Sequence, residues 1–258
     1  MKIVKHLAPN FIKRRYLGMQ QRLDKLEGSV RNLEAVIDAL VVQPSYLSGE
    51  DVGFNGQRCR KHIFGDIISA ISPDAIVETG TWLGNTTGYM AQTAKRPVYS
   101  GELNPRFHAV AKKRLADIKN VRLILKDSRA FLHELAQGEL SGKCLFFYLD
   151  AHWYEDLPLG EEIDLIASAW RRFVVMIDDF KVPDDDGYAF DDYGNGKTLG
   201  LELLGPAMAM HSLAAYFPAA RSQEETGARR GCVVLAAQGD LTEKLSVLTS
   251  LRQWRGPA

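Results

Sequence analysis

Hydrophobic residues recur in steps of three and four along the first part of the chain. The seam positions are Tyr16, Met19, Leu23, Leu26, Val30, Leu33, Ile37 and Leu40. This a/d heptad spacing, with charged residues around it, predicts a helix that joins subunits as a parallel or antiparallel coiled coil. A long amphipathic helix folded onto its own domain would show the same spacing. We expect residues 1–43 to hold a basic start and this oligomerisation helix, and residues 44–61, rich in glycine and proline, to form a linker.

From residue 62 onward, short apolar runs alternate with helical patterns. Buried strands are predicted at 74–80, 97–103, 121–127, 144–150 and 173–179, each followed or preceded by a helix-length segment. Strands with helical crossovers require a doubly wound, mostly parallel α/β sheet. Two further strands, at 213–219 and 231–238, have no helix between them and predict a closing antiparallel hairpin, for seven strands in all. The segment 239–254 is expected to be a helix with a capping box of Asp240 and Glu243.

Charge and cysteine content narrow the function classes. Lys+Arg and Asp+Glu are equal at 32 each, which argues against a dedicated nucleic-acid binder. The three cysteines are isolated, so neither a disulfide framework nor a cysteine zinc site is expected, and a reducing cytoplasm is the expected location. No run approaches the about 20 apolar residues of a membrane span, and the start lacks the apolar core of a secretory signal.

The first 22 residues carry six basic side chains and no acid. With apolar residues interspersed, such a segment is able to rest weakly on an anionic membrane face. A solvated basic tail is the alternative, since Pro9 interrupts any helix there.

The strand ends carry the chemistry, because ligands of a parallel sheet bind outside the carboxyl ends of its strands. The first strand ends in an E-x-G-x-x-x-G pattern that contains Glu78, Gly80, Thr81 and Gly84. The second ends at Glu102, whose carboxylate can accept two hydroxyl hydrogen bonds. The third ends at Asp127-Ser128, the fourth at Asp150 with His152 close behind, and the fifth at Asp178-Asp179.

This ordered set resembles the class I S-adenosylmethionine-dependent methyltransferases. The resemblance spans about residues 60 to 240 in the segments VETGTWLGNTT, SGELNP, KDSRAFL, FYLDAHW and MIDDF. It implies a Rossmann-like fold in which the Gly80–Gly84 loop, with Thr81, faces the amino-acid part of the cofactor. It also implies that Glu78 helps to hold the ammonium group and Glu102 binds the ribose hydroxyls. Asp127 and Ser128 would flank the adenine.

Within this superfamily, Asp150, Asp178 and Asp179 resemble the metal triad of Mg²⁺-dependent O-methyltransferases of the catechol and macrolide-sugar type. Three carboxylates on adjacent strand ends are costly unless a cation neutralises them, and hard oxygen ligands suit Mg²⁺. The alternative keeps Asp150 as a substrate contact and Asp178-Asp179 as a helix-capping turn.

His152 is a candidate general base, since its pKa lies near working pH. Catechol-type relatives place a lysine close to this position, and no lysine stands between Asp150 and Arg171 here. His152 is alternatively a fourth ligand or a partner of a ligating acid.

The segment 181–200 is long and polar for an ordinary connection. Its glycines allow hinge motion, and Tyr188, Phe190 and Tyr193 are able to cover a substrate, so we expect a lid; a disordered surface loop is the alternative.

Together these features predict an O-methyltransferase acting on a hydroxyl of a small molecule, such as a sugar or secondary metabolite. One alternative is a non-catalytic coiled-coil module on a nucleotide-binding fold. A second is a metal-dependent hydroxylase of the cephalosporin type, which is ranked low because no second histidine lies beside the acids.

Overall fold

The computed structural model describes residues 19–20, 22–23, 26, 53–152, 157–194 and 196–256. The chain divides into two compact units, Met1–Ser48 and Gly49–Ala258. The described residues of the first unit, Met19, Gln20, Arg22, Leu23 and Leu26, are helical. The rest of the heptad segment, the basic start and residues 44–52 of the linker lie outside the described residues. The coiled coil and the membrane contact therefore stay predictions.

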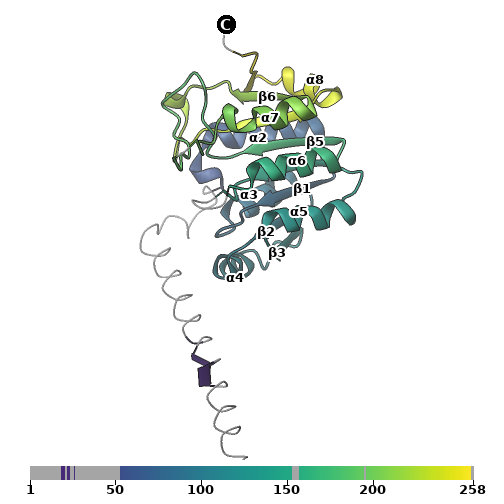
Figure 1. The fold of residues 1–258 in the computed structure, drawn as a ribbon, viewed down its shortest axis with the longest axis vertical. Helices are drawn as coiled ribbons and strands as arrows, with labels where there is room; N and C mark the ends of the chain where they lie inside the picture. Colours follow the sequence, from purple (N-terminus) through teal and green to yellow (C-terminus); the bar gives the residue numbers. More distant parts are fainter. Residues whose placement is uncertain are drawn as a thin grey trace, which may run out of the picture. The chain divides into compact units, whose positions relative to one another are not determined.

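The second unit alternates helices and strands (Figure 1). In chain order its elements are η2 (Gly53–Gly56), α2 (Arg58–Ile71), β1 (Ala75–Thr79), α3 (Asn85–Ala94), β2 (Val98–Glu102), α4 (Pro105–Arg114), β3 (Val121–Leu125), α5 (Ser128–Gln137), β4 (Cys144–Leu149), α6 (Leu159–Ala169), β5 (Arg172–Ile177), α7 (Leu201–His211), β6 (Leu213–Pro218), η3 (Ser222–Glu224), β7 (Val233–Ala237), α8 (Asp240–Ser246) and β8 (Leu251–Gln253).

One mixed sheet holds all the described strands, in the order β3-β2-β1-β4-β5-β7-β6-β8. The first five strands pair in parallel, and β6, β7 and β8 pair antiparallel. This confirms the mostly parallel α/β sheet and the closing hairpin. Parallel strands buried on both faces read as continuous apolar runs, which is why β1, β4 and β5 were visible in the sequence.

The prediction of seven strands is wrong, because an eighth closes the sheet. Helix α8 ends at Ser246, and β8 then pairs with β6 through Tyr216, Phe217 and Pro218. That pairing covers the outer edge of β6, where backbone groups would otherwise stay unpaired. The cap also differs from the prediction: Thr242 Oγ1 bonds to both the N–H and the C=O of Gly239, and Asp240 is the first helical residue.

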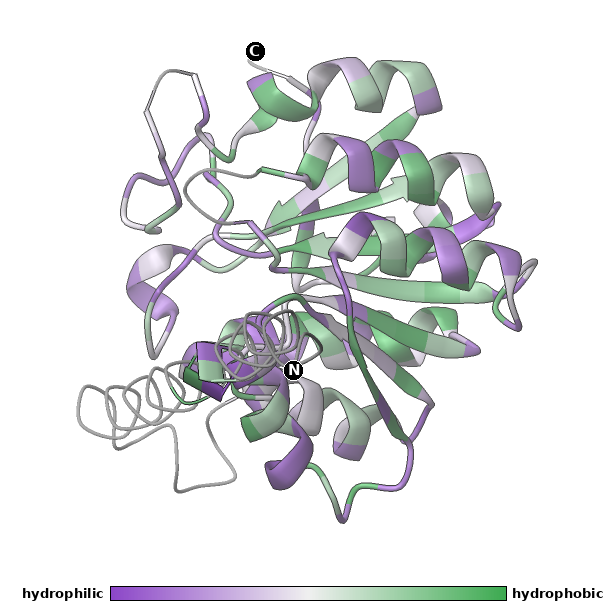
Figure 2. Cartoon of the chain, turned by 60° about the horizontal axis from the view of Figure 1, so that its bottom comes forward, coloured by the Kyte–Doolittle hydropathy of each residue, from purple (hydrophilic) through white to green (hydrophobic). Residues whose placement is uncertain are grey.

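Helices cover both faces of the sheet. The core on one face includes residues of α5, α6 and α7, and the core on the other includes residues of α2, α3 and α8. Figure 2 shows the strands as the apolar centre of the unit, with hydrophilic residues on the helices that flank them. No helix among the described residues combines the length and the apolar character that a membrane span requires.

The folded unit begins before residue 62, where the sequence placed its start. The glycines of η2 belong to a tight turn in which Phe54 and Asn55 adopt positive φ angles of 53° and 55°. Phe54 is fully buried and packs its ring against Phe64, Tyr89 and Tyr148. Residues 53–61 are therefore part of the domain core, and only the earlier part of segment 44–61 remains a predicted linker.

Candidate active site

The strand ends bring acids from separate parts of the chain to one edge of the sheet. Thr79 at the end of β1 pairs with Leu149 at the end of β4, and Leu149 pairs with Ile177 at the end of β5. Asp150 and Asp178 follow these residues directly. Adjacent strands thus deliver their acids side by side, as the parallel topology predicts.

Asp150, His152 and Asp179 converge at this edge and are called the cation cluster below. Each offers one ligand atom, and these atoms all lie within 4.8 Å of one another. His152 Nε2 is 3.7 Å from Asp150 Oδ1 and 4.0 Å from Asp179 Oδ2. The imidazole is buried, and its Nε2 has no hydrogen-bond partner among the described residues. Two carboxylates and an imidazole this close form a donor set that fits a divalent cation.

Burial and charge shift the pKa of each group in the cluster. Burial, reinforced by the Asp178 and Asp179 carboxylates, raises the pKa of Asp150 well above its usual range. Burial and the Asp178 charge raise the pKa of Asp179 to about 7. Burial lowers the pKa of His152, which leaves the imidazole neutral at pH 7. Crowded carboxylates of this kind are stabilised in their ionised form by a bound cation.

Asp178 does not belong to the cluster. Its Oδ1 accepts from the Arg60 guanidinium and its Oδ2 from the Tyr148 hydroxyl, and both partners are buried. Burial opposes ionisation of Asp178, but the Arg60 charge and these hydrogen bonds hold its pKa below its ordinary value. The sequence placed Asp178 in a metal triad with Asp150 and Asp179. The structure brings His152 to that place instead, because Arg60 already neutralises Asp178.

A second guanidinium lies beside the cluster. Arg230 donates through Nε to Asp179 Oδ1 and through Nη2 to Asp191 Oδ1. The cluster and its surroundings thus hold four carboxylates and two guanidiniums, those of Asp150, Asp178, Asp179, Asp191, Arg60 and Arg230. With all four carboxylates ionised, the excess of two negative charges would equal the charge of one divalent cation.

The glycines after β1 serve close packing of the chain. A Cβ on Gly80 would lie 2.2 Å from the Asp150 carbonyl oxygen, and Gly80 has a φ of +85°. A Cβ on Gly84 would lie 2.8 Å from Leu115 Cδ1. Thr81 hydrogen-bonds through Oγ1 to the hydroxyl of Ser100. The loop from Gly80 to Gly84 therefore fits tightly between the end of β4 and the residues after α4.

Glu78 lies inside the sheet. It is 1% exposed, and its Oε2 accepts from the hydroxyls of Thr87 and Ser100. Burial raises the pKa of Glu78 to about 7. Its hydroxyl partners link β1 to α3 and β2.

The end of β2 combines a carboxylate with exposed apolar groups. Glu102 accepts from the backbone N–H of Asn104 through Oε1 and from that of Trp82 through Oε2. Leu103 is 65% exposed and Trp82 is 37% exposed. The buried Asn85 Nδ2, at the start of α3, has no hydrogen-bond partner among the described residues. An acceptor for hydroxyls, an apolar surface for a base and an unused donor fit a nucleoside cofactor.

Asp127 and Ser128 lie at the junction of β3 and α5. Asp127 is the N-cap of α5, and its carboxylate also accepts from the Arg129 guanidinium. Ser128 is buried beside Glu162, a core carboxyl whose pKa burial raises to about 7. The predicted adenine-flanking residues thus occupy the expected strand end, and the helix cap accounts for much of the hydrogen bonding of Asp127.

The three aromatic residues of the predicted lid have different surroundings. Tyr188 is 2% exposed and donates its hydroxyl to the Ala220 carbonyl, so it belongs to the core. Phe190 lies under the Lys181 ammonium, 5.4 Å from the ring centroid. Tyr193 donates to Asp191, and its hydroxyl oxygen is 3.5 Å from the His152 carbonyl oxygen. The structure brings only Tyr193 of these described aromatics to the cation cluster by a direct contact.

Sequence reasoning missed Arg60, Arg230 and Asp191. Arg60 stands 118 residues before Asp178, and Arg230 stands 51 residues after Asp179. Neither arginine has a local pattern that marks it as a partner of a strand-end acid. Asp191 lies in the polar segment 181–200, where its contacts with Arg230 and Tyr193 distinguish it.

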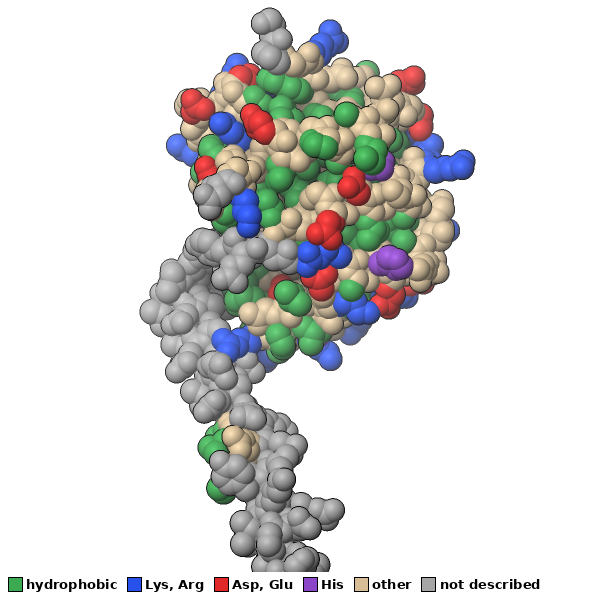
Figure 3. Space-filling model, viewed as in Figure 1, with side chains coloured by type: hydrophobic (Ala, Val, Ile, Leu, Met, Phe, Trp, Pro, Cys, Tyr) green, Lys and Arg blue, Asp and Glu red, His purple; other side chains and the backbone are tan. Residues whose placement is uncertain are grey.

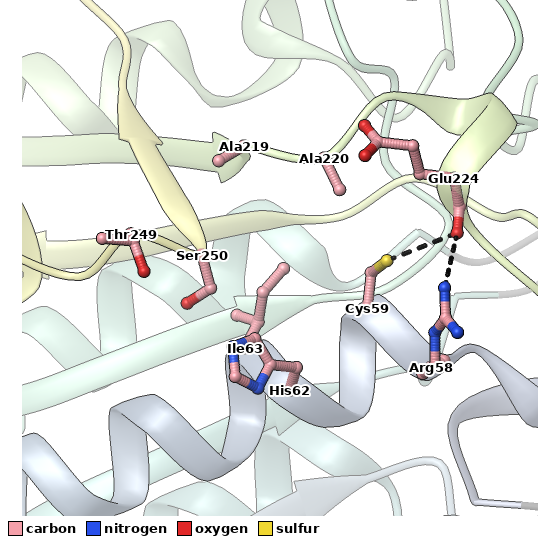
Figure 4. Close-up of a pocket in the computed structure, with 9 residues that line it drawn as sticks. All are labelled: Arg58, Cys59, His62, Ile63, Ala219, Ala220, Glu224, Thr249 and Ser250. Atoms are coloured by element: carbon pink, nitrogen blue, oxygen red, sulfur yellow. Dashed lines mark hydrogen bonds between the residues drawn. The ribbon is translucent and has the colours of Figure 1, made fainter.

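A separate pocket of about 510 Å³ lies between the start of α2 and the segments that flank β6 and β8 (Figure 4). Arg58 and Cys59 approach the Glu224 carbonyl oxygen at its rim, with His62 and Ser250 across from them. None of the cluster residues lines this pocket, so it is distinct from the candidate active site.

Comparison with known proteins identifies the fold. No protein-family model and no curated protein matches the chain. The chain is similar to an O-methyltransferase from Bacillus cereus solved with S-adenosylhomocysteine, with a TM-score of 0.54, 14% identity, and coverage of 81% of this chain and 91% of that chain. It is also similar to TomG, an O-methyltransferase from Streptomyces achromogenes involved in tomaymycin synthesis and solved with S-adenosylmethionine. For TomG the TM-score is 0.50, the identity 15%, and the coverage 70% of this chain and 80% of that chain. The chain therefore has the fold of the class I S-adenosylmethionine-dependent methyltransferases.

Proposed function

We propose that the chain is an S-adenosylmethionine-dependent O-methyltransferase that acts on a hydroxyl of a small molecule with the help of a divalent cation, Mg²⁺. The observation that carries this proposal is the convergence of Asp150, His152 and Asp179 at the carboxyl edge of the sheet. The two similar O-methyltransferases were solved with the methyl donor or its product, which supports the same cofactor here.

The cofactor is proposed to lie along the ends of β1, β2 and β3. Glu102 would accept from the ribose hydroxyls, and Leu103 would contact the base from its exposed position. Asp127 and Ser128 would flank the adenine. The Gly80–Gly84 loop, Thr81 and Asn85 would face the amino-acid part. Glu78 is buried and accepts hydrogen bonds from Thr87 and Ser100, so we propose that it supports this loop from within the sheet. S-adenosylmethionine supplies an activated methyl group on its sulfonium when bound.

The cation cluster is proposed to bind and deprotonate the acceptor hydroxyl. Asp150 and Asp179 would hold the divalent cation, which would supply charge that lowers the pKa of the acceptor hydroxyl. In this role His152 is not itself a ligand: its neutral, unpartnered Nε2 lies beside both carboxylates and would accept the proton. Asp178, ionised through Arg60, adds negative charge next to the site without occupying it.

A small hydroxylated acceptor fits the charge distribution better than nucleic acid. Basic and acidic side chains are interspersed on the face seen in Figure 3. The segment 181–200 is rich in acids and brings Asp191 close to the cluster, which would disfavour a phosphate backbone there. The cluster contains one histidine among the described residues, whereas an iron hydroxylase site would use two. A reducing cytoplasm remains the expected location.

Two measurements test this function. Calorimetry with S-adenosylhomocysteine should show binding in the micromolar range, and absence of binding at millimolar ligand would exclude the enzyme in favour of an assembly module. Methyl transfer to a panel of sugars and phenolic metabolites should then depend on added Mg²⁺ and stop with EDTA. Methyl transfer that is unaffected by EDTA would reject the requirement for a cation but not the methyltransferase activity.

We further propose that the N-terminal helix pairs two copies of the chain in parallel. Met19, Leu23 and Leu26 are helical and 59%, 53% and 63% exposed, so their shared apolar face is open to a partner. The later a positions of the heptad, Val30 and Ile37, are β-branched, while the d positions after Met19 are leucine. β-Branched residues at a with leucine at d favour two-stranded coils.

The flanking charges favour the parallel orientation. With Tyr16 at position a, the g flank carries only basic charge and the e flank only acidic charge, at Arg15, Arg22, Glu27 and Glu34. A parallel pair sets each g position against an e position of its partner, which joins Arg22 to Glu27. An antiparallel pair would set like charges against each other.

Cysteine cross-linking tests the orientation. Met19→Cys lies near one end of the seam, so it should form an intermolecular disulfide in a parallel dimer only. The wild-type chain, with its three native cysteines, is the control. Light scattering should give the mass of two chains for the wild type and the mass of one chain for Leu26→Lys. A monomeric wild type would reject self-association, and a dimer without the Met19→Cys disulfide would reject the parallel orientation.

A further inference from the structure

The backbone of Arg230 is fixed by two residues from the beginning of the domain. The Gln57 amide accepts from the Arg230 N–H at 3.1 Å and donates to the Arg230 carbonyl at 2.8 Å. Arg60 Nη2 donates to the same carbonyl at 2.6 Å. Gln57 and Arg60 are both buried. The backbone N–H and C=O of Arg230 are therefore both fixed by hydrogen bonds, which sets the position from which its side chain extends.

The guanidinium of Arg230 joins two carboxylates from different segments. One is Asp179 after β5, and the other is Asp191 in the segment 188–199, called the acidic loop below. Because Arg230 occupies Oδ1 of Asp179, Oδ2 is the oxygen that faces His152. Asp179 has a φ of +54°, a conformation that a non-glycine residue keeps only when its surroundings hold it. Arg230 thus determines which oxygen Asp179 offers to the cluster.

The acidic loop returns to the cluster through the same contacts. Asp191 accepts from the Tyr193 hydroxyl, which lies 3.5 Å from the His152 carbonyl oxygen. The Asp191 N–H donates to the Asp179 carbonyl at 2.9 Å. Ala189 also forms a β-bridge with Arg230. The loop is therefore attached to the cluster and to Arg230 through both side-chain and backbone contacts.

We propose that Arg230 is a positioning residue that couples the acidic loop to the cation cluster. This rests on the proposed function, since it takes the cluster to bind a divalent cation. A cation bound by Asp179 through its remaining oxygen would favour the same carboxylate orientation that Arg230 holds through Oδ1. Because Arg230 also binds Asp191, that orientation is linked to the position of the acidic loop. Because such coupling is reciprocal, a bound cation would stabilise the acidic loop in this arrangement, and the arrangement would strengthen cation binding.

Hydrogen exchange of the full-length protein, with and without Mg²⁺, tests the coupling. In the wild type, Mg²⁺ should slow exchange of the Asp191 and Leu199 amides by about tenfold, a usual size for coupled sites. Arg230→Lys keeps the charge, but a single ammonium does not bridge both carboxylates. This variant should still bind Mg²⁺ in calorimetry and lose the cation-dependent slowing.

A charge-matched pair separates the bridge from simple electrostatics. Asp191→Asn should lose the slowing, whereas Asp192→Asn removes the same charge from a neighbouring exposed position and should keep it. Slowing that persists in Arg230→Lys and Asp191→Asn overturns the coupling, as does Mg²⁺ binding to the wild type without slowing. If calorimetry shows no Mg²⁺ binding to the wild type, the cation cluster itself is rejected, and the two failures are thereby told apart.

Discussion

Asp178 and Asp179 are neighbours in sequence and differ in burial, in hydrogen-bond partners and in the direction of their pKa shifts. Asp178 is 1% exposed, and its two oxygens are taken by Arg60 and Tyr148. Asp179 shares one oxygen with Arg230 and presents the other toward His152. The Arg60 guanidinium and the hydrogen bonds to Asp178 lower its pKa in spite of burial, whereas burial and the Asp178 charge raise the pKa of Asp179.

The difference shows how one acidic pair divides into a structural and a chemical member. A carboxylate that is almost fully buried and already neutralised by a guanidinium is not accessible to an incoming cation. A carboxylate with one satisfied oxygen is oriented and still has a free acceptor. The supply of partners from distant segments therefore decides which acid of a D-D pair is available for chemistry.

The largest expected effect is a loss of stability when Asp178, the structural member of the pair, loses its counter-charge. Arg60→Met leaves Asp178 buried without its counter-charge, and it should lower the free energy of unfolding by about 3–5 kcal/mol. Urea unfolding measures this, and Arg58→Met, two residues earlier and more exposed, is the control with little change. A loss below about 1 kcal/mol would show that Tyr148 alone satisfies Asp178.

The next effect concerns Asp150, which lies in the cation cluster with Asp179. Asp150→Asn removes one of the two carboxylates of the cluster and should weaken Mn²⁺ or Mg²⁺ binding by at least about 100-fold, beyond the range of outer contacts. Calorimetry checks this against Asp186→Asn, an exposed acid of segment 181–200 that should bind as the wild type does. Equal affinity in both variants would contradict the cluster.

Glu78 sharpens the comparison, since it is buried with hydroxyl partners and no counter-charge. Its folded-state pKa of about 7 lies above the ordinary value of 4.5. The folded state therefore keeps a proton that the unfolded state releases, so this stabilisation is complete below about pH 4.5 and is lost as pH rises toward 7. Relative to Glu78→Gln, the wild type should lose on the order of 2 kcal/mol between pH 5 and pH 8. Urea unfolding across that range measures it, and a constant difference would refute it.

The smallest effect tests the second partner of Asp178. Tyr148→Phe removes one hydrogen bond to a charged acceptor and should cost about 1.5 kcal/mol of stability. Cation affinity should stay at the wild-type value, because the hydroxyl contacts only Asp178 among the described residues. A large drop in cation affinity would mean that Asp178 and Asp179 act as one unit.

The sheet was predictable because its strands are marked locally. Fully buried parallel strands are apolar runs, and Asp150 and the pair Asp178-Asp179 follow two of them directly. Strand order then placed both acids at one edge. Helix α7 was not predicted: it contains Pro206, and the polar segment before it drew attention to the loop instead.

The partners of the acids were not predictable by the same means. Arg60 and Arg230 reach the site from an early helix and from a segment before β7, and no spacing rule connects them to β5. The roles expected of the glycines also required coordinates, since the Asp150 carbonyl that excludes a side chain at Gly80 belongs to another strand. Local patterns specify elements, whereas charge compensation depends on tertiary contacts.

The buried pair of Gln57 and Arg60 bears on how the domain can be dissected. A shortened protein that begins at His62, where the sequence alone placed the domain boundary, would retain every strand of the sheet. It would nevertheless lose the amide that holds Arg230 and the guanidinium that neutralises Asp178. Truncations meant to separate the folded unit from the segment before it should therefore be cut before Gly53.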